Sequence, residues 1–94
     1  MKLTGLIAAP HSPFRADHSL NLECVPQQAA HLAACGVNGA FVAGTTGECH
    51  SLTTPERAQL FAGWGEAARE HGVQFIAHIG HNNLPDARAL ACLL

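Results

Sequence analysis

The sequence predicts an α/β fold, on two observations. First, three apolar runs recur at an interval of about 35 residues, the length of a strand, a helix and their loops. They cover residues 3–9, 40–43 and 73–79, and each precedes turn residues and then a helical pattern. Second, the runs are continuously apolar, as in parallel strands covered on both faces. We therefore expect about three βα units with strands in the order 1-2-3, the N-terminal segment of a (β/α)8 barrel.

The first helix is expected over residues 25–35. Gly36 stands just past its end, where glycine commonly terminates helices. Apolar side chains recur at helical spacing through this stretch, so one face should be buried. These are Leu22, Val25, Ala29 and Leu32.

The second helix is predicted to open with a capping box. The Thr53 hydroxyl can accept from a free amide while Glu56, three residues later, reaches back to the start. Gly72 should close this helix. Two internal glycines each cost about 1 kcal/mol relative to alanine, so packing must stabilise it. The glycines are Gly63 and Gly65, and the buried stripe is Leu60, Trp64 and Ala68.

The third helix should begin at Asn83 as its N-cap, with Asp86 in the first turn. Its apolar pattern continues to Leu94. Neither a linker nor a charge run interrupts the sequence. We therefore interpret residues 1–94 as the N-terminal part of a single barrel domain, cut within the third helix.

Charge and hydropathy exclude two classes of partner. The chain has five Lys and Arg residues and a formal net charge of −2, which leaves no basic surface for nucleic acid or anionic lipid. The apolar stretch at residues 6–9 is bounded by Gly5 and Pro10 and is too short for a signal or membrane segment. We expect a cytoplasmic protein.

The cysteines and histidines do not suggest a metal site. The four cysteines show no C-x-x-C spacing, which favours reduced thiols. There are seven histidines. Two pairs of potential ligands stand close in sequence, Cys49 with His50 and His78 with His81, but neither pair has the spacing of a zinc knuckle or a helical ligand set. We interpret them as loop and surface residues and expect no metal.

Residues 44–48, GTTGE, are the most informative segment for function. They follow the second strand, at the end of the sheet where parallel α/β folds place their active sites. Glycines at positions 44 and 47 permit a tight bend, and hydroxyls and amides of Thr45 and Thr46 can converge on a carboxylate. The pentapeptide by itself fits an anion-binding nest and an ordinary strand-to-helix turn equally.

A longer motif distinguishes these interpretations. Residues 36–57, GVNGAFVAGTTGECHSLTTPER, resemble the signature of the dihydrodipicolinate synthase and N-acetylneuraminate lyase family. Residues 5–14, GLIAAPHSPF, resemble that family's first strand and loop. Residues 76–80, IAHIG, with Asn82 resemble its third strand and the start of its third helix. The resemblance covers essentially the whole chain, in the family's order.

The resemblance implies a lyase or aldolase acting through a Schiff base. Family members are (β/α)8 barrels, usually tetramers, in which a lysine condenses with pyruvate or a related 2-oxo acid. They make or break the adjacent carbon–carbon bond without a cofactor or metal. Thr45 and Thr46 would occupy the substrate-carboxylate positions, and Thr45 would also pass a proton toward a tyrosine. Gly44 and Gly47 would shape the turn. Fixing the carboxylate orients the carbon that becomes the enamine nucleophile.

Residues beside the motif have less defined roles. Glu48 could be a general base, but we favour a structural role in which its carboxylate accepts backbone hydrogen bonds. Pro10 is assigned to the structure of the first loop. His11 and Ser12 depart from the family's pattern, which leaves a substrate role for them open.

The nucleophile of the family is missing from this sequence. There are no tyrosines, and the single lysine, Lys2, precedes the first strand at the opposite end of the barrel from residues 44–48. The chain alone is therefore expected to be inactive. The alternative is a non-catalytic fragment that associates with itself or with a full-length relative through an exposed sheet edge.

His78 gives a weak indication of the family branch. In its strand context it resembles the neuraminate lyase branch more than the dihydrodipicolinate synthase branch. We favour a structural role for His78, as a core histidine that donates to a neighbouring carbonyl, over a catalytic role.

Overall fold

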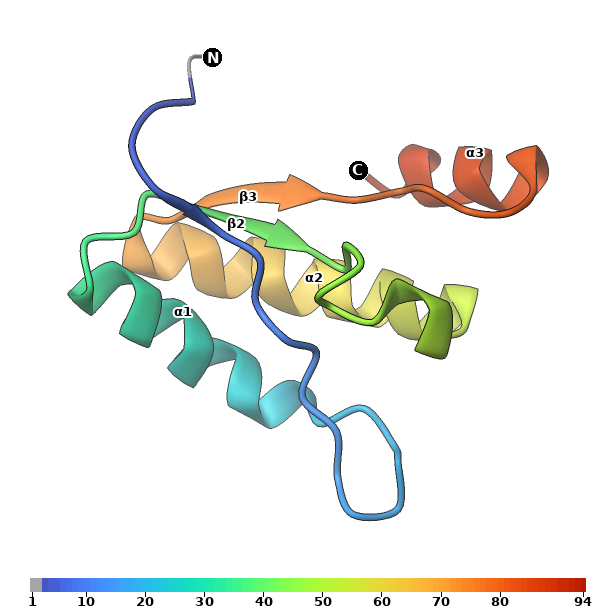
Figure 1. Cartoon of the computed structure of the whole chain (residues 1–94), viewed down its shortest axis with the longest axis horizontal. Helices are drawn as coiled ribbons and strands as arrows, with labels where there is room; N and C mark the ends of the chain where they lie inside the picture. The colour runs from blue at the N-terminus through green and yellow to red at the C-terminus, as the bar shows by residue number, and fades with distance from the viewer. Residues whose placement is uncertain (1–2) are drawn as a thin grey trace.

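The computed structural model describes residues 3–94 and contains one sheet of three parallel strands in the order β1-β2-β3 (Figure 1). In the register of the sheet, Ala8 pairs with Ala40, and Ala40 pairs with Phe75. The predicted α/β class, the parallel direction and the strand order are confirmed. The strands are β1 (Ile7–Ala8), β2 (Gly39–Val42) and β3 (Gln74–Ala77).

β1 and β3 are shorter than the apolar runs that predicted them, and β2 has the predicted length but begins and ends one residue earlier. β1 covers two residues of the run 3–9, because Gly5 adopts a left-handed conformation (φ 82°) that interrupts extended backbone. β2 ends one residue before Ala43, which is also left-handed (φ 59°). Hydrophobicity alone therefore located the strands but not the backbone reversals that end them.

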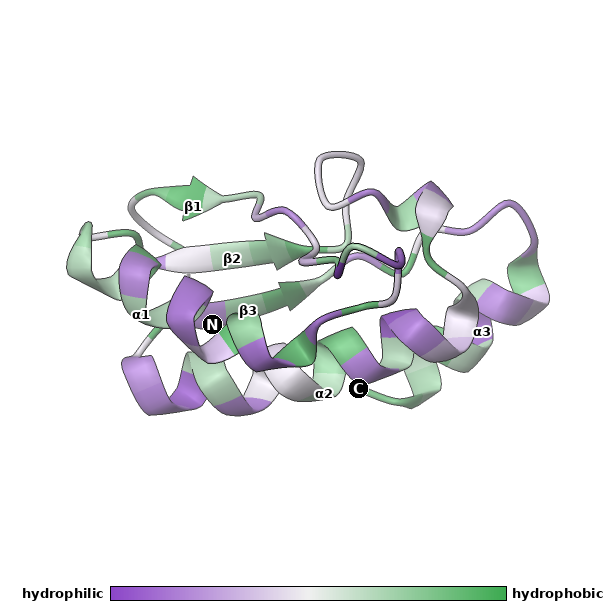
Figure 2. Cartoon of the chain, turned by 90° about the horizontal axis from the view of Figure 1, so that it is seen from below, coloured by the Kyte–Doolittle hydropathy of each residue, from purple (hydrophilic) through white to green (hydrophobic). Residues whose placement is uncertain are grey.

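Two helices cover one face of the sheet (Figure 2). The helix α1 (Val25–Ala34) follows a short 3-10 helix, η1 (Leu22–Cys24). The helix α2 (Thr54–His71) follows a second one, η2 (Cys49–Ser51). The predicted capping box is present at the start of α2, and a left-handed Gly72 ends it.

The helix α3 (Leu84–Cys92) follows β3, with the side chain of Asn83 accepting a hydrogen bond from the amide of Asp86. This is the predicted N-cap. Leu93 is the C-cap, so the helix ends two residues before Leu94. In Figure 1, α3 lies beyond the carboxyl ends of the strands, beside the first turns of α2.

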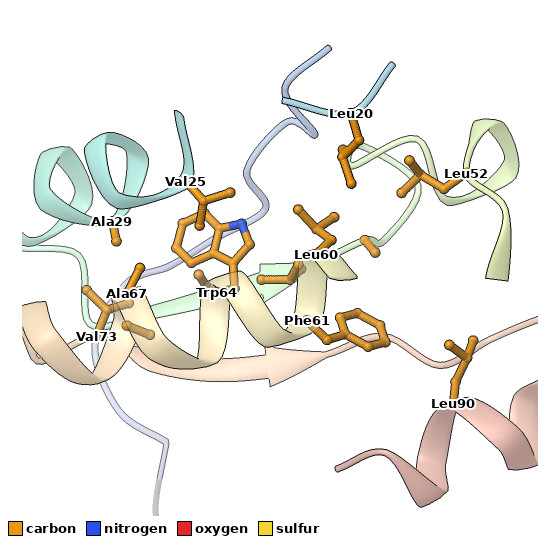
Figure 3. Packing of buried hydrophobic residues seen from close by; sticks show 14 residues of the cluster. Leu20, Val25, Ala29, Leu52, Leu60, Phe61, Trp64, Ala67, Val73 and Leu90 are labelled. Atoms are coloured by element: carbon orange, nitrogen blue, oxygen red, sulfur yellow. The ribbon is translucent and has the colours of Figure 1, made fainter. Parts of the chain in front are cut away.

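The hydrophobic core lies between the sheet and the pair α1 and α2 (Figure 3). Trp64 is its largest member and is 1% exposed. The predicted buried stripe of α2 is confirmed, and α1 contributes Val25 and Ala29. The core continues to Leu90 of α3. Packing of this kind offsets the cost of the two glycines inside α2.

The opposite face of the sheet is not covered by any helix in the described chain (Figure 2). At the β1 edge of the sheet, Leu6, directly before β1, and Ile7, within it, are 68% and 44% exposed. Within residues 3–94, no helix combines the length and the hydropathy needed to cross a bilayer. Lys2, which the sequence placed at the far end of the barrel, lies outside the described residues.

Candidate functional site

The loop of residues 44–48 leaves the carboxyl end of β2 and reverses within five residues. Two non-glycine residues with left-handed backbones bound it, Ala43 (φ 59°) and Glu48 (φ 58°). Inside the loop, the amide of Glu48 donates to the carbonyl of Thr45 at 3.0 Å. The amide of Cys49 donates to the carbonyl of Gly44 at 3.2 Å. The loop is therefore a compact turn with defined backbone geometry.

Both glycines of the loop stand where a side chain would collide with a neighbour. A Cβ atom at Gly44 would lie 2.6 Å from the ring of Phe41. A Cβ atom at Gly47 would lie 3.0 Å from the backbone nitrogen and Cα of Ala43. Close approach, rather than a positive φ angle, is thus the reason for glycine at these two positions.

Thr45 and Thr46 are both exposed at the tip of this loop. Neither hydroxyl bonds another residue in the part of the chain described here, so both are available to a ligand. Thr45 also lies on the rim of an open hollow of about 460 Å³. This hollow extends toward the end of β3 and is lined by Cys49, His50, Leu52, Arg57, His78, Gly80, His81 and Asn82.

Ser12 connects the first loop to the loop of residues 44–48. Its side chain is buried, and its hydroxyl donates to the carbonyl of Gly47 at 2.5 Å. The sequence left the role of Ser12 open, and the structure assigns it a contact with the loop. No local pattern could have indicated this, because the bond joins residues 35 positions apart.

His78 lies just after β3 and contacts the loop from the other side. Its Nδ1 atom is 2.9 Å from the carbonyl oxygen of Ala43. A carbonyl oxygen only accepts, so Nδ1 carries the hydrogen. The expected structural contact of His78 with a neighbouring carbonyl is confirmed. The imidazole ring also packs against Phe41, with 5.5 Å between ring centroids.

Arg57 is a functional candidate that the sequence did not single out. It projects from the first turns of α2, is 2% exposed, and donates to the main-chain carbonyls of Gly80 (2.6 Å) and His78. Burial lowers the pKa of its guanidinium. The side chain pairs with no carboxylate within residues 3–94, so the two carbonyls stabilise its buried charge.

Glu48 differs from its expected mechanism. It is the N-cap of η2, but its exposed side chain makes no capping hydrogen bond. The left-handed backbone of Glu48, and not its carboxylate, forms the turn.

His11 lies in the first loop, and its main-chain carbonyl accepts a hydrogen bond from the side chain of Gln28 at 2.8 Å. Among the described residues, its imidazole ring makes no hydrogen bond to the loop of residues 44–48.

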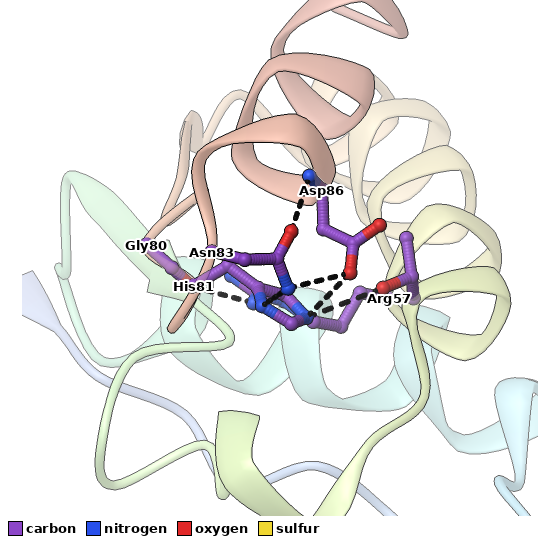
Figure 4. A network of polar contacts seen from close by, with 6 residues as sticks. Arg57, Gly80, His81, Asn83 and Asp86 are labelled. Atoms are coloured by element: carbon purple, nitrogen blue, oxygen red, sulfur yellow. Dashed lines mark hydrogen bonds and ion pairs between the residues drawn. The ribbon is translucent and has the colours of Figure 1, made fainter.

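A polar network joins the first turns of α2 and α3 (Figure 4). His81 lies 3.4 Å from the Thr54 hydroxyl and 3.6 Å from a carboxylate oxygen of Asp86. Asn83 contacts both His81 and Asp86.

All four cysteines are free thiols that form no disulfide. Across residues 3–94 there is no group of three or more His, Cys, Asp or Glu side chains placed to hold a metal ion.

Taken together, the site is a bent loop with two free hydroxyls. Ser12, in the segment after β1, bonds to Gly47 of the loop, and His78, directly after β3, bonds to Ala43 just before the loop. Arg57 of α2 bonds to the main chain around His78. A nest of small residues of this kind suits a small carboxylate, because amides and hydroxyls can surround its oxygens. The site offers positioning groups and, among the described residues, no amine nucleophile.

Sequence comparison shows extensive similarity to known enzymes. The model of the dihydrodipicolinate synthetase family matches residues 2–94. The N-acetylneuraminate lyase of Danio rerio is 38% identical over 91 residues, which are 96% of this chain and 30% of the relative. The human N-acetylneuraminate lyase is 35% identical over 91 residues, 96% of this chain and 28% of the relative.

Solved structures show the same similarity in three dimensions. The N-acetylneuraminate lyase of Proteus mirabilis superposes with a TM-score of 0.93 at 42% identity, over 99% of this chain and 31% of the other. The dihydrodipicolinate synthase of Aquifex aeolicus superposes with a TM-score of 0.88 at 25% identity, over 97% and 30%. These relatives are (β/α)8 barrels, which confirms the predicted fold class. The chain spans about 30% of the length of the relatives it matches.

Proposed function

This chain belongs to the dihydrodipicolinate synthetase family, and from that premise we propose that it supplies the substrate-carboxylate loop of a carbon–carbon lyase of the N-acetylneuraminate lyase type. The substrate would be a 2-oxo acid such as pyruvate, and the proposed reaction needs no metal or cofactor. The proposed binding residues are Gly44, Thr45, Thr46 and Gly47, with Thr45 also acting in proton transfer.

The observation that carries this proposal is the geometry of the loop. Thr45 and Thr46 are exposed with free hydroxyls at the carboxyl end of a parallel strand, where barrel enzymes bind substrates. Gly44 packs against Phe41 and Gly47 against Ala43, which leaves no room for a side chain at either glycine. Pro10 and Glu48 are proposed to shape the neighbouring backbone rather than to react.

The pattern of relatives supports the branch. The curated relatives that match over 96% of the chain include N-acetylneuraminate lyases at 35–38% identity. Among the solved structures, N-acetylneuraminate lyases of Proteus mirabilis and Aliivibrio salmonicida reach 42% and 39%, against 25% for the Aquifex synthase. His78 was the residue whose context suggested this branch from the sequence.

The proposed chemistry assigns this chain a binding and positioning role. A lysine amine would condense with the C2 carbonyl of the 2-oxo acid, releasing water and leaving a protonated imine that accepts the electrons of the C3–C4 bond as it breaks. Holding the carboxylate fixes which face of C3 the partner carbonyl meets. Residues 1–94 contain one lysine, Lys2, which precedes the first strand. The proposed reaction therefore needs a lysine that these 94 residues do not supply.

A hybrid enzyme tests the proposal. Residues 1–94 would replace the matching 31% of the Proteus mirabilis lyase, with which they superpose closely. We expect this hybrid to release pyruvate from N-acetylneuraminate and to be trapped on pyruvate by borohydride. Thr45→Val and Thr46→Val should raise the KM for pyruvate, whereas Thr54→Val, a threonine outside the loop, should not. A folded hybrid that neither binds pyruvate nor responds to these substitutions would contradict the proposed function.

The isolated 94-residue chain is the control for the hybrid. It should give no pyruvate adduct after borohydride, because its only amines are the N-terminus and Lys2. Mass spectrometry measures the adduct directly. A stable pyruvyl adduct on this chain would show that a nucleophile has been overlooked.

A further inference from the structure

We infer that Arg57 and His78, here called the Arg57–His78 pair, are positioning residues that fix the carboxylate loop from behind. The inference rests on the proposed function for what the loop binds, but its structural part stands on the contacts of the pair. Neither side chain belongs to the loop, and neither is proposed to touch the substrate.

The residue directly before the loop, Ala43, is strained and requires external support. Ala43 holds a left-handed backbone (φ 59°), which is unfavourable for a residue with a Cβ atom. Such conformations persist where surrounding contacts determine them, and they cluster at functional sites. The carbonyl of this same residue accepts the hydrogen bond from His78 Nδ1. The histidine therefore acts on the peptide unit that starts the loop.

His78 is itself confined by two neighbours, Phe41 and Gly80. Phe41 packs against its ring, and the same Phe41 ring fills the space a Cβ at Gly44 would need. Gly80 lies so close that a Cβ there would be 2.6 Å from His78 Nε2. The imidazole thus has little freedom to rotate away from the carbonyl of Ala43.

Arg57 fixes the main chain that carries this histidine. Its guanidinium donates to the carbonyls of His78 and Gly80, in the segment that leads from β3 to α3. The side chain is 2% exposed and has no carboxylate partner among the described residues, and its buried Nε atom makes no hydrogen bond. Burying a cation is unfavourable unless it is well bonded, so this arginine has a specific structural task at the end of β3.

The chain of contacts therefore runs from α2 through the end of β3 to the start of the loop. Arg57 orients the backbone of His78, His78 orients the carbonyl of Ala43, and Ala43 sets the direction in which Thr45 leaves the sheet. Loss of either side chain should loosen the loop without removing a group that contacts substrate.

Hydrogen exchange of residues 1–94 within the hybrid enzyme, followed peptide by peptide, tests the structural part. His78→Leu removes the donor and should increase the exchange rate of the amides in residues 44–49 about tenfold, the effect of losing one buried hydrogen bond. His78→Asn should restore slow exchange, because the Asn Nδ2 atom can occupy the place of Nδ1. His78→Gln, whose amide corresponds to Nε2, should not. Arg57→Lys, which keeps the charge but loses the fork of donors, should resemble His78→Leu.

His81→Leu is the matched control. It removes a histidine three positions later that contacts Thr54, Asn83 and Asp86 but not the loop. Exchange in residues 44–49 should remain unchanged in this variant. Equal loosening of the loop by His81→Leu and His78→Leu, or no loosening by His78→Leu in a chain whose α2 stays protected, would overturn the inference.

The hybrid enzyme tests the positioning part separately. His78→Leu should raise the KM for pyruvate about tenfold and leave the KM for the sugar substrate unchanged, with rescue by His78→Asn. If Thr45→Val raises the pyruvate KM but His78→Leu does not, the positioning role is wrong while the proposed function stands. If neither variant changes the KM for pyruvate, the proposed function fails.

Discussion

Gly47 shows how a single missing side chain determines the shape of the candidate site. A Cβ atom there would press on backbone atoms of Ala43 at 3.0 Å, and backbone yields less readily than the end of a side chain. The carbonyl of the same glycine accepts the buried hydrogen bond from Ser12. Gly47 is therefore held from two directions.

Gly47→Ala should destabilise the chain and displace the loop. The overlap costs about 1–3 kcal/mol, the usual range for inserting a methyl group into a packed site, and it also lengthens the bond from Ser12. Urea unfolding followed by tryptophan fluorescence measures the change, because Trp64 is buried in the core. An unchanged unfolding midpoint would mean that the loop relaxes freely around the new methyl group.

The residues of the site were predictable from sequence only where they form a contiguous motif. The run from Gly44 to Glu48 was identified because its members are adjacent and stand at the end of an apolar run. Ser12 and Arg57 contact the site across 35 and 21–23 positions of sequence, and no local pattern encodes such contacts. The role predicted for the carboxylate of Glu48 is wrong for a different reason: the residue shapes the turn through its left-handed backbone, and its side chain makes no capping hydrogen bond.

Among the elements, α2 was predicted most fully because its signals are local. The capping box at its start and the left-handed glycine at its end both depend on neighbours within four residues. Strand lengths were less predictable. A strand ends where pairing or a backbone reversal ends it, as at Gly5 and Ala43, and hydrophobicity does not record either.

Thr53→Ala should weaken α2. The Thr53 hydroxyl accepts from the amide of Glu56 at 3.2 Å, and the Glu56 carboxylate accepts from the amide of Thr53 at 2.8 Å. Loss of this cap costs about 1 kcal/mol. Thermal unfolding by circular dichroism would show a lower midpoint, whereas Thr53→Ser, which keeps the hydroxyl, should retain most of the stability.

Gly63→Ala and Gly65→Ala should have the opposite effect. A Cβ at Gly63 would meet Leu22 at 3.8 Å, and one at Gly65 would meet Phe75 at 3.9 Å, both ordinary contact distances. Each alanine removes a helix-interior glycine and should stabilise the chain by about 0.5–1 kcal/mol. The same thermal unfolding experiment checks both substitutions. A lower midpoint would show that α2 needs glycine at these positions for closer packing than the structure contains.

At the scale of the whole molecule, the order of the strands was predictable from the sequence. The exposure of the sheet face opposite α1 and α2 was predictable only in part. Right-handed βα crossovers permit the order 1-2-3 directly, and the structure and its relatives show it. The matched part covers 31% of the Proteus mirabilis lyase, so about two thirds of that chain lies outside it. In the described chain the face opposite α1 and α2 is not covered by any helix (Figure 2).

This uncovered face predicts how the 94-residue chain behaves in solution. The outer edge of β3 has no strand paired to it among residues 3–94, and Leu6 and Ile7 at the β1 edge are 68% and 44% exposed. Leu84, at the start of α3, is also 60% exposed. Unpaired edges and large apolar surfaces favour association. We expect light scattering on dilute, reduced protein to show an oligomer or an aggregate. The dye 8-anilinonaphthalene-1-sulfonate should become more fluorescent when it is mixed with the chain, because it binds exposed apolar surface. Leu6→Lys together with Ile76→Lys, which places one charge directly before β1 and one on β3, should shift the population toward monomer. A monodisperse wild-type monomer with a sharp cooperative melt would show instead that three βα units suffice to close this core, and would remove the physical basis for a non-catalytic role in association.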